Sequence, residues 1–535
     1  MLKSSGAMAG ATLISRVLGM VREMVYYSFM GVGWVNDAFQ LAFTIPNLFR
    51  RLLGEGALTA AFIPIFKEKE KLEGEAEMWR SANAVISGLI VSASAVIAVV
   101  LLVVSGVLML SHHHPDTLGL NPPTELMLQL LRVMFPYMLL VCLAAALMGM
   151  LNARGYFFIP AMGAASLNVV MIASVLWLAP KFATDLPKDE RLPHQIFALA
   201  IGVLAAGVAQ TAFQLPTLYR DGFRFRWVPP WGNETVRRVV LRMIPGAIGV
   251  AAFQINVAIV QLLGFKFGNG IVSSFNGGVR LMELPQGMFG ISLATYLLPT
   301  LSALATDKNY KEFRSTLKHG LGTLIFLNLI AAVLLAVLAE PIVRLLFERG
   351  KFGPDATLRV AVALMCLAPG LVAFSSVNIF ARAFYALGDT QTPMKISIGC
   401  LILNLALAVG LIFPFKQGGL GLANSVTSIC NVTLLTIFLR KKLGKLEMES
   451  LRATFAPLAI GAILAGVTAW GIWYWWEGHL GHHNLALKIG AVFVPATAAG
   501  VVYWVVGTMA KIPAAQEILD FIFARVSKKG GAARL

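Results

Sequence analysis

Three arginines, Arg22, Arg50 and Arg280, lie inside stretches that are otherwise apolar enough to cross a membrane. A guanidinium at bilayer depth costs about 3 kcal/mol or more, so an intramembrane arginine usually faces a water-filled cavity or a bound partner. The planar guanidinium can bind two oxygens of a carboxylate or phosphate at once. The residue type and its depth therefore predict that the protein holds an anionic molecule within the membrane.

The segments that must position these arginines are predicted to be membrane-spanning helices. Of the 535 residues, 57% are hydrophobic and only 13% are charged. Many apolar runs, such as 84–110 and 317–338, reach the length of about twenty residues that crosses about 30 Å of hydrocarbon. The sequence predicts an all-α, polytopic membrane protein with about fourteen transmembrane helices between residues 7 and 508. All four cysteines fall within such runs, and we expect them to be packing residues rather than disulfide partners.

The charge of the predicted connections alternates along the chain. By the positive-inside rule, the connections rich in Lys and Arg lie in the cytoplasm together with both termini. The basic set is 66–80, 219–238, 306–314 and 439–452; the other set is 31–36, 111–123, 415–419 and 476–484, and only the connections near 181–191 and 344–359 run against the pattern. The formal net charge of +17 then reflects topology and contact with anionic lipid headgroups, and we expect no nucleic-acid partner.

Prolines indicate an internal repeat. Pro64 and Pro299 each close an apolar segment, and they are 235 residues apart. Three further pairs recur at offsets of 233 or 234, namely Pro136 with Pro369, Pro160 with Pro393, and Pro180 with Pro414. The repeat predicts two six-helix halves, 1–225 and 235–443, followed by two extra helices in 453–508 and an amphipathic cytoplasmic tail in 511–535. Repeated bundles around a central site are a common transporter architecture, in which rocking of the halves gives alternating access.

The sequence carries no recognisable catalytic motif. It has neither the GxxxxGK[ST] phosphate loop nor the HExxH zinc motif, and no segment outside the apolar runs is large enough for a nucleotide-binding domain. We therefore expect a transporter rather than an enzyme, without a cofactor, driven by the membrane potential, a monovalent ion or the gradient of its substrate. Two groups of histidines are interpreted as polar loop residues in preference to metal ligands: His112–His114, and His479, His482 and His483.

Three segments resemble the MurJ (MviN) family of lipid II flippases: SRVLGMVRE (15–23), NDAFQLAFTIPNLFRRLLGEGALTAAFIPIF (36–66) and VRLMELPQGMFGISLATYLLP (279–299). The resemblance spans essentially the whole chain, and the family belongs to a superfamily that also contains multidrug and polysaccharide exporters. It implies transport of lipid II, undecaprenyl-pyrophosphate disaccharide-pentapeptide, from the inner to the outer leaflet of the bacterial cytoplasmic (inner) membrane, in support of peptidoglycan synthesis, cell-wall biogenesis and cell shape. The partners it implies are lipid II, membrane lipids and cell-wall synthesis proteins.

The resemblance also implies which residues serve the substrate. Five positions match functional residues of the family and are expected to bind the pyrophosphate or to balance charge in the empty site: Arg16, Arg22, Asp37, Arg50 and Arg280. Five neighbours are candidate supporting residues: Glu23, Asn47, Arg51, Glu55 and Glu283. Simpler roles are open to several of these residues: Arg16 can pair with Glu23, Arg51 can reach the lipid headgroups, Glu55 can cap or pair locally, and Glu283 can pair with Arg280 one helical turn away.

A sodium site occurs in some members of the resembled family, built around a carboxylate on the seventh transmembrane helix. The corresponding segment here, 242–264, offers Gln254 and Asn256 but no carboxylate. Asn378 is the remaining candidate sodium ligand, although Arg382 one turn further on would repel a cation. The membrane potential is a sufficient alternative, because moving one charge across it is worth about 2.3 kcal/mol per 100 mV.

The two extra helices fall outside the repeat, and we expect a groove beside them to hold part of the lipid tail. Two alternatives to lipid II transport remain open. The protein could export another lipid-linked oligosaccharide or drugs, although drug exporters would more naturally use acidic residues for cationic drugs. It could also be a non-transporting membrane scaffold.

Overall fold

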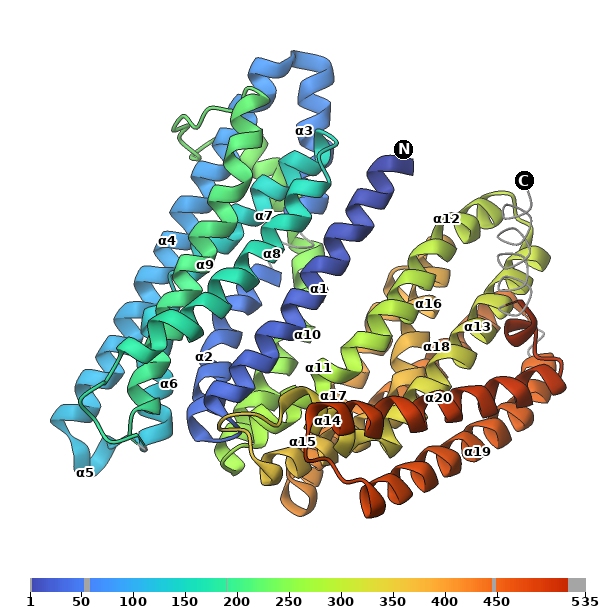
Figure 1. Ribbon diagram of the computed structural model, residues 1–535. Helices are drawn as coiled ribbons and strands as arrows, with labels where there is room; N and C mark the ends of the chain where they lie inside the picture. Colours follow the sequence, from blue (N-terminus) through green and yellow to red (C-terminus); the bar gives the residue numbers. More distant parts are fainter. Residues whose placement is uncertain (1, 52–57, 189, 445–448, 518–535) are drawn as a thin grey trace, which may run out of the picture. The chain divides into compact units, whose positions relative to one another are not determined.

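The computed structural model describes residues 2–51, 58–188, 190–444 and 449–517, and the regular structure of these residues is entirely helical (Figure 1). The predicted all-α fold is therefore confirmed. Glu55 and the part of the predicted tail beyond residue 517 lie outside the described residues. The chain separates into two compact units: unit 1 is Met1–Ser273 with Arg349–Phe352, and unit 2 is Ser274–Glu348 with Gly353–Leu535. The predicted halves, extra helices and tail follow the sequence repeat instead, and their boundaries stay a prediction.

Unit 1 is a bundle of long helices packed around α7. Tyr137, Met138 and Cys142 of α7 are each at most 1% exposed, because α3, α4 and α9 cover this helix. The helices are α1 (Leu2–Met30), α2 (Trp34–Phe49), α3 (Thr59–Glu73), α4 (Glu75–His113), α5 (Pro115–Leu118), α6 (Pro122–Met134), α7 (Tyr137–Ala153), α8 (Phe158–Ala173) with its π-helical and 3-10 continuations Ser174–Leu178 and Ala179–Lys181, α9 (Leu192–Arg220) and α10 (Glu234–Phe267); α11 (Ile271–Pro285) begins here.

Unit 2 has two apolar clusters. One lies among α12, α13, α16 and α18, and the other joins α13 to the two extra helices α19 and α20. In the second cluster, the rings of Phe326 and Tyr503 stack at 4.9 Å, and the Tyr503 hydroxyl donates to the Phe326 carbonyl at 3.0 Å. The helices are the remainder of α11, the π-helix Gln286–Ile291, α12 (Ser292–Thr306), α13 (Tyr310–Val337), α14 (Ala339–Phe347), α15 (Pro354–Leu367), the 3-10 turn Ala368–Gly370, α16 (Leu371–Ala386), α17 (Gln391–Phe415), α18 (Gln417–Leu443), α19 (Glu449–His479) and α20 (Leu485–Met509).

The described helices fit the predicted multi-pass architecture. Ten spans are long and apolar enough to cross a membrane, and α6 with α7 forms one more that bends by 45° at Pro136. The bend follows from the proline, which donates no backbone hydrogen bond and clashes with the preceding turn. Added to these eleven, α1, the pair α2 and α3, and α10 would make up the predicted set of about fourteen; residues 52–57, between α2 and α3, lie outside the described part. All four cysteines are free, as expected for packing residues.

The turns after α7 and after α16 are related by the sequence repeat. Gly155 and Gly388 are 233 residues apart, and both adopt a left-handed backbone conformation with φ of 88° and 73°. Glycine reaches this region without the penalty that a side chain imposes. Each turn leads into a helix that packs on the last helix of its half, α8 on α9 and α17 on α18. The repeat therefore extends from the sequence to the geometry of the connections.

Candidate functional site

Arg22 of α1 is held by side chains from two helices. Its guanidinium donates to Asn168 Oδ1 of α8 at 3.0 Å and to Glu23 Oε1 at 2.5 Å, and it stands 5.6 Å from the centre of the Tyr26 ring. Asn168 also donates to the Ser15 carbonyl at 3.3 Å, which ties α8 to α1. Glu23 is thus an ion-pair partner of Arg22, and the charge of this arginine is partly balanced without a ligand.

Two polar atoms beside this ion pair have no hydrogen-bond partner within the described residues. They are the Nε of Arg22 and the hydroxyl of Tyr26, and both are buried. A buried donor without an acceptor costs about 1–3 kcal/mol. An acceptor that reached these two atoms would remove that cost, so the surroundings of Arg22 favour an incoming oxygen ligand.

Asp37 is almost completely buried near the start of α2. Its two carboxylate oxygens accept the backbone N–H groups of Gly270 and Ser273, each at 2.7 Å, at the first turn of α11. A carboxylate at a helix N-terminus satisfies donors that the helix itself leaves unpaired and interacts favourably with the helix dipole. Asp37 therefore fastens α2 to the first turn of α11 in unit 1. Its expected role in balancing an arginine stays a prediction.

Arg50 follows the last residue of α2, and one of its hydrogen bonds is to a residue of that helix. Its Nε donates to Asn47 Oδ1 at 2.7 Å, and the arginine is half-buried, as is the neighbouring Arg51. Tyr137 of α7 lies within electrostatic range of both Arg50 and Arg22. Two of the predicted substrate residues thus share one neighbourhood in unit 1. Glu55 cannot be placed with them, because it lies outside the described residues.

Arg280 and Arg16 are less enclosed. Arg280 of α11, in unit 2, forms an ion pair with Glu283 at 3.0 Å, and both side chains are more than 40% exposed. The simpler role suggested for Glu283 is therefore present. Arg16 is exposed on α1. The contribution of both arginines to substrate binding stays a prediction.

Asn378 of α16 was the candidate sodium ligand. Its amide donates to the Phe374 carbonyl one turn earlier in the same helix, at 3.2 Å. Across the part of the chain that the structure describes, no group of three or more His, Cys, Asp or Glu residues could hold a metal ion. A sodium site at Asn378 stays a prediction.

Arg154 forms a contrasting site, which we call the Arg154 joint, at the turn between α7 and α8. It binds three carboxylates: Asp221 at 2.6 Å, Glu75 at 3.1 Å, and Glu70 through a short ion pair. The hydrogen bond to Asp221 raises the pKa of Arg154 further, and hydrogen bonds from Lys67 and then Arg154 lower the pKa of Glu70. An arginine surrounded by carboxylates has its charge already compensated, which favours a structural role.

The repeat-related turn in unit 2, which we call the Asp389 joint, uses the opposite arrangement of charge. Asp389 accepts a hydrogen bond from Lys442 at the end of α18, at 2.8 Å, and from the backbone N–H and hydroxyl of Thr392 at 3.0 and 2.9 Å. These bonds, led by that from Lys442, lower the pKa of Asp389 to about 2. As in unit 1, the charge pair ties the turn to the last helix of the half.

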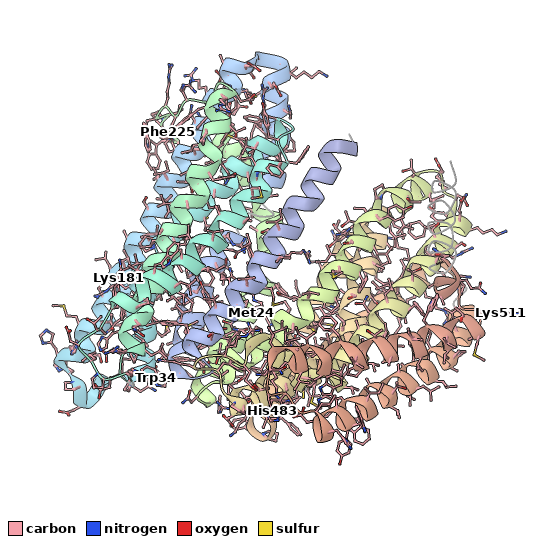
Figure 2. All side chains as sticks on the ribbon, in the orientation of Figure 1. Met24, Trp34, Lys181, Phe225, His483 and Lys511 are labelled. Atoms are coloured by element: carbon pink, nitrogen blue, oxygen red, sulfur yellow. The ribbon has the colours of Figure 1, made fainter. Side chains whose placement is uncertain are left out.

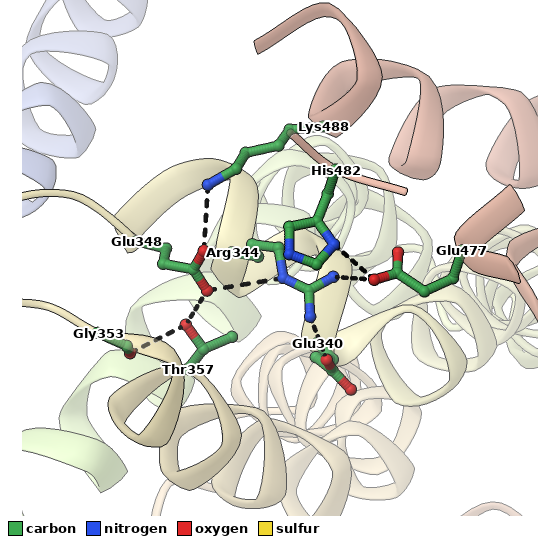
Figure 3. A network of polar contacts seen from close by, with 8 residues as sticks. All are labelled: Glu340, Arg344, Glu348, Gly353, Thr357, Glu477, His482 and Lys488. Atoms are coloured by element: carbon green, nitrogen blue, oxygen red, sulfur yellow. Dashed lines mark hydrogen bonds and ion pairs between the residues drawn. The ribbon is translucent and has the colours of Figure 1, made fainter. Parts of the chain in front are cut away.

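A third cluster, which we call the Arg344 hub, joins the extra helices to the rest of unit 2 (Figure 3). Arg344 of α14 contacts Glu340 at 2.5 Å, Glu477 at 3.3 Å and Glu348 at 3.6 Å; His482 lies 2.5 Å from Glu477, and Lys488 lies 3.1 Å from Glu348. Burial opposes ionisation of Glu348, but hydrogen bonds from Thr357 and Lys488 outweigh it and lower the pKa. This arginine, too, is compensated by carboxylates and has a structural role.

The helical bundle and its apolar spans define a multi-pass membrane protein, and the comparisons with known proteins identify its family. The family model "Lipid II flippase MurJ" matches residues 27–489. The chain belongs to the lipid II flippase MurJ family. The expectation of a transporter rather than an enzyme is confirmed by this membership.

Individual relatives agree with the family model. The chain is 33% identical to "Probable lipid II flippase MurJ" of Buchnera aphidicola subsp. Acyrthosiphon pisum over 462 residues, covering 85% of this chain and 86% of the relative. It is also 33% identical to "Lipid II flippase MurJ" of Burkholderia cenocepacia over 490 residues, covering 88% and 90%. The similarity thus extends over most of both chains.

Solved structures show the same fold. "Lipid II flippase MurJ, inward closed conformation" matches with a TM-score of 0.70 at 20% identity, covering 93% of this chain and 98% of that one. An inward-facing multidrug resistance MATE family transporter of the MOP superfamily matches with a TM-score of 0.64 at 13% identity, covering 83% and 99%. At these identities the likeness shows the fold alone.

Sequence reasoning missed two residues of the Arg22 site, Asn168 and Tyr26. Asn168 lies 146 residues from Arg22 in the chain, so no local pattern links them. The available signal was weak: an amide within an apolar run, which needs a hydrogen-bond partner in a membrane. Tyr26 stands one turn after Arg22, and its spacing could have indicated the contact.

Proposed function

We propose that the protein moves lipid II from the inner to the outer leaflet of the bacterial cytoplasmic membrane. The observation that carries this proposal is the family match over residues 27–489, supported by relatives whose names describe lipid II flippases. The substrate follows from the family, and the chemistry of unit 1 suits its pyrophosphate. The protein is a transporter in peptidoglycan synthesis and acts as a multi-pass protein of the inner membrane.

The pyrophosphate is bound by Arg22 and Arg50, with Arg16, Asp37 and Arg280 as the further predicted contacts. Arg22 supports this assignment because its Nε and the nearby Tyr26 hydroxyl are buried donors without acceptors among the described residues. A phosphate oxygen would accept from both. Charge-assisted hydrogen bonds of this kind contribute about 1.5–3 kcal/mol each. In the empty site the ion pair with Glu23 lowers the cost of holding the charge of Arg22. When the substrate binds, its phosphate competes with Glu23 for the guanidinium.

Transport proceeds by alternating access, with the basic connections and both termini in the cytoplasm. This orientation rests on the distribution of Lys and Arg among the connections. The membrane potential, positive outside, drives export of an anionic headgroup, at about 2.3 kcal/mol per charge per 100 mV. No soluble cofactor takes part in this scheme.

The direct test is to deplete the protein and replace it with Arg22→Ala, Arg22→Lys or the wild type, then measure how much lipid II becomes accessible in the outer leaflet. We expect Arg22→Ala to bind lipid II about 10- to 100-fold more weakly, the equivalent of one charge-assisted hydrogen bond. Arg22→Lys should recover only part of the loss, because an ammonium lacks the bidentate fork. The matched control is Arg80→Ala, which removes an arginine that is 72% exposed and pairs with Glu77 at 3.7 Å.

Two outcomes would contradict the proposal. If depletion leaves outer-leaflet lipid II unchanged, the protein is not the flippase, and transport of another lipid-linked oligosaccharide becomes the better account. If depletion lowers it but Arg22→Ala restores it as well as the wild type does, lipid II transport stands and the assignment of Arg22 is wrong. Equal membrane levels of all variants are the necessary control for folding.

Orientation is tested separately by labelling cysteines with an impermeant thiol reagent. Gly478→Cys of α19 should react from outside intact cells, and Leu72→Cys of α3 should react only after the cells are opened. Both positions are exposed, and an added side chain at Gly478 meets nothing within 4 Å. Reversed labelling would overturn the orientation and the direction of transport.

A further inference from the structure

The connection between α9 and α10 holds aromatic and basic side chains on its outer surface. We call residues 223–231 the strap. Phe225, Trp227 and Trp231 of the strap are 46%, 54% and 74% exposed. Arg226 within the strap and Arg220 at the end of α9 are exposed as well. Figure 2 labels Phe225 on the outside of unit 1. A large aromatic side chain buries about 150–250 Å² at an interface. Three such side chains exposed close together therefore indicate an interaction site.

The strap is fastened to α4 through its backbone, so the exposed side chains are not a result of looseness. Asn83 donates to the Arg224 carbonyl at 2.9 Å and accepts from the Arg226 N–H at 3.2 Å. Ser87 accepts from the Val228 N–H at 3.2 Å. Phe223, which is 1% exposed, packs its ring 5.6 Å from that of Trp79. The strap is therefore fixed to α4 by its backbone and by Phe223, while Phe225, Trp227 and Trp231 stay exposed.

The position along α4 shows what surrounds the strap. This helix has 39 residues, about 58 Å at 1.5 Å per residue, and so exceeds the roughly 30 Å of hydrocarbon in a bilayer. Its continuous apolar run is 84–110, and the strap bonds to Asn83 and Ser87 at the start of that run. The strap thus lies where the helix leaves the hydrocarbon, at the level of the lipid headgroups. Tryptophan and arginine are the residues suited to this level.

We propose that the strap is a docking site for anionic phospholipid headgroups. The rings of Phe225, Trp227 and Trp231 enter the interface, and Arg220 and Arg226 bind lipid phosphate. The charge is complementary, because the adjacent Asp221 is compensated by Arg154. A lipid is favoured over a protein partner because the strap is bonded to α4 at Asn83 and Ser87, where the apolar run of that helix begins and lipid headgroups lie beside it. This site concerns the surrounding lipid rather than the transported one, and it goes beyond the proposed function.

The test uses the full-length protein with its four cysteines replaced by alanine and a donor fluorophore on Pro229→Cys, an exposed position within the strap. The protein is reconstituted in phosphatidylcholine vesicles that contain a trace of acceptor-labelled lipid, either phosphatidylglycerol or phosphatidylcholine. We expect energy transfer to report about 30-fold enrichment of the anionic lipid, since Arg220 and Arg226 each contribute a factor of about five, equivalent to about 1 kcal/mol, at the membrane surface. Raised salt should weaken the enrichment.

The deciding comparison is between two double variants with the same change in net charge. Arg220→Gln with Arg226→Gln should abolish the enrichment, whereas Lys71→Gln with Arg80→Gln, two exposed basic residues of the same unit outside the strap, should leave it. An equal loss in both would show general attraction to a basic protein and overturn the site. Absence of enrichment in the wild type would overturn the site as well. So would protection of Pro229→Cys from a thiol reagent by a protein in native membranes, if lipid in vesicles gave no such protection. Unchanged thermal unfolding of the variants excludes misfolding.

Discussion

The Arg154 joint and the Asp389 joint occupy equivalent places in the repeat but are built with opposite charges. In unit 1 the turn supplies the cation, Arg154, and the end of α9 is followed by the anion, Asp221. In unit 2 the turn supplies the anion, Asp389, and the end of α18 supplies the cation, Lys442. Both turns keep a left-handed glycine, and each turn is followed by a proline. These prolines, Pro160 and Pro393, are 233 residues apart, as the two glycines are. The repeat has thus preserved the backbone of the joint and the presence of a charge pair, but not its polarity.

The two joints also differ in how many elements they connect. The guanidinium of Arg154 contacts α3, α4 and the residue after α9 together, whereas within the described residues the ammonium of Lys442 contacts the single carboxylate of Asp389. The Arg154 side chain is 18% exposed and that of Lys442 is 39% exposed. A planar fork with five donors can serve several acceptors, which a compact ammonium on a flexible stem does less well. The first joint is therefore a hub, and the second is a single clip.

The largest expected effect comes from Arg154→Leu. This change leaves Glu70, Glu75 and Asp221 facing one another without their shared cation. We expect it to lower the free energy of unfolding of unit 1 by about 2–3 kcal/mol, somewhat less than the roughly 3–5 kcal/mol for a fully buried pair, because the joint is partly solvated. Thermal unfolding of the purified protein in detergent measures it. A loss no larger than that caused by Lys442→Leu would remove the distinction between hub and clip.

The second effect distinguishes the joints by exchanging their charges. In unit 2, Asp389→Lys combined with Lys442→Asp restores an ion pair, so the double variant should be more stable than either single variant. In unit 1, Arg154→Asp combined with Asp221→Arg places the new aspartate beside Glu70 and Glu75, and little recovery should follow. Double-mutant cycles give the two coupling energies. Equal recovery in both units would mean that the two extra carboxylates of unit 1 contribute nothing.

A smaller effect is expected from Lys442→Ala. The pair with Asp389 is more than a third exposed on the lysine side, and such pairs contribute about 0–1 kcal/mol. Asp389 keeps its hydrogen bonds from Thr392. We expect a loss of about 0.5 kcal/mol that shrinks further in high salt, measured by thermal unfolding at two salt concentrations. If the free energy of unfolding fell by more than about 2 kcal/mol independently of salt, the Asp389 joint would resemble the Arg154 joint instead.

The smallest effect is the pH dependence of the clip. The pKa of Asp389 is about 2 in the folded protein against 3.8 for an ordinary aspartate, so its ionised form is favoured by folding. The stabilisation it provides is present above the unfolded pKa and is lost as the pH falls from about 4 toward 2. Asp389→Asn should abolish this part of the loss, visible as a shallower decline of unfolding temperature with acid. An unchanged decline would show that Asp389 is not specifically stabilised.

The sequence predicted the spans and the repeat because both rest on properties that are local or periodic. Runs of apolar residues mark the helices, and the proline offsets indicate the repeat. The partners of charged residues could not be predicted in the same way. Asp37 accepts the backbone N–H groups of Gly270 and Ser273, more than 230 residues away, and its pairing with an arginine stays a prediction. Such a partner depends on packing, which no spacing along one helix specifies.

Two further features lay beyond the sequence for related reasons. Asn168 meets Arg22 only because α8 packs on α1, and an amide in an apolar run has many possible partners. The basic residues of the connection near 344–359 run against the positive-inside pattern. The structure explains this for one of them, since Arg344 is compensated by Glu340, Glu348 and Glu477. A paired arginine does not carry the free charge that the rule depends on.

The Arg344 hub bears on what removal of the two extra helices would do to the rest of unit 2. Glu477, His482 and Lys488 come from the hairpin of α19 and α20, while Arg344 and Glu348 belong to the repeated part of the chain. Cutting the chain after residue 443 would therefore remove partners of both Arg344 and Glu348. Arg344 would keep Glu340 and Glu348, and Glu348 would keep Thr357, so part of the network would survive the cut. The hairpin is therefore held to the rest of unit 2 by ion pairs as well as by the apolar cluster that it shares with α13.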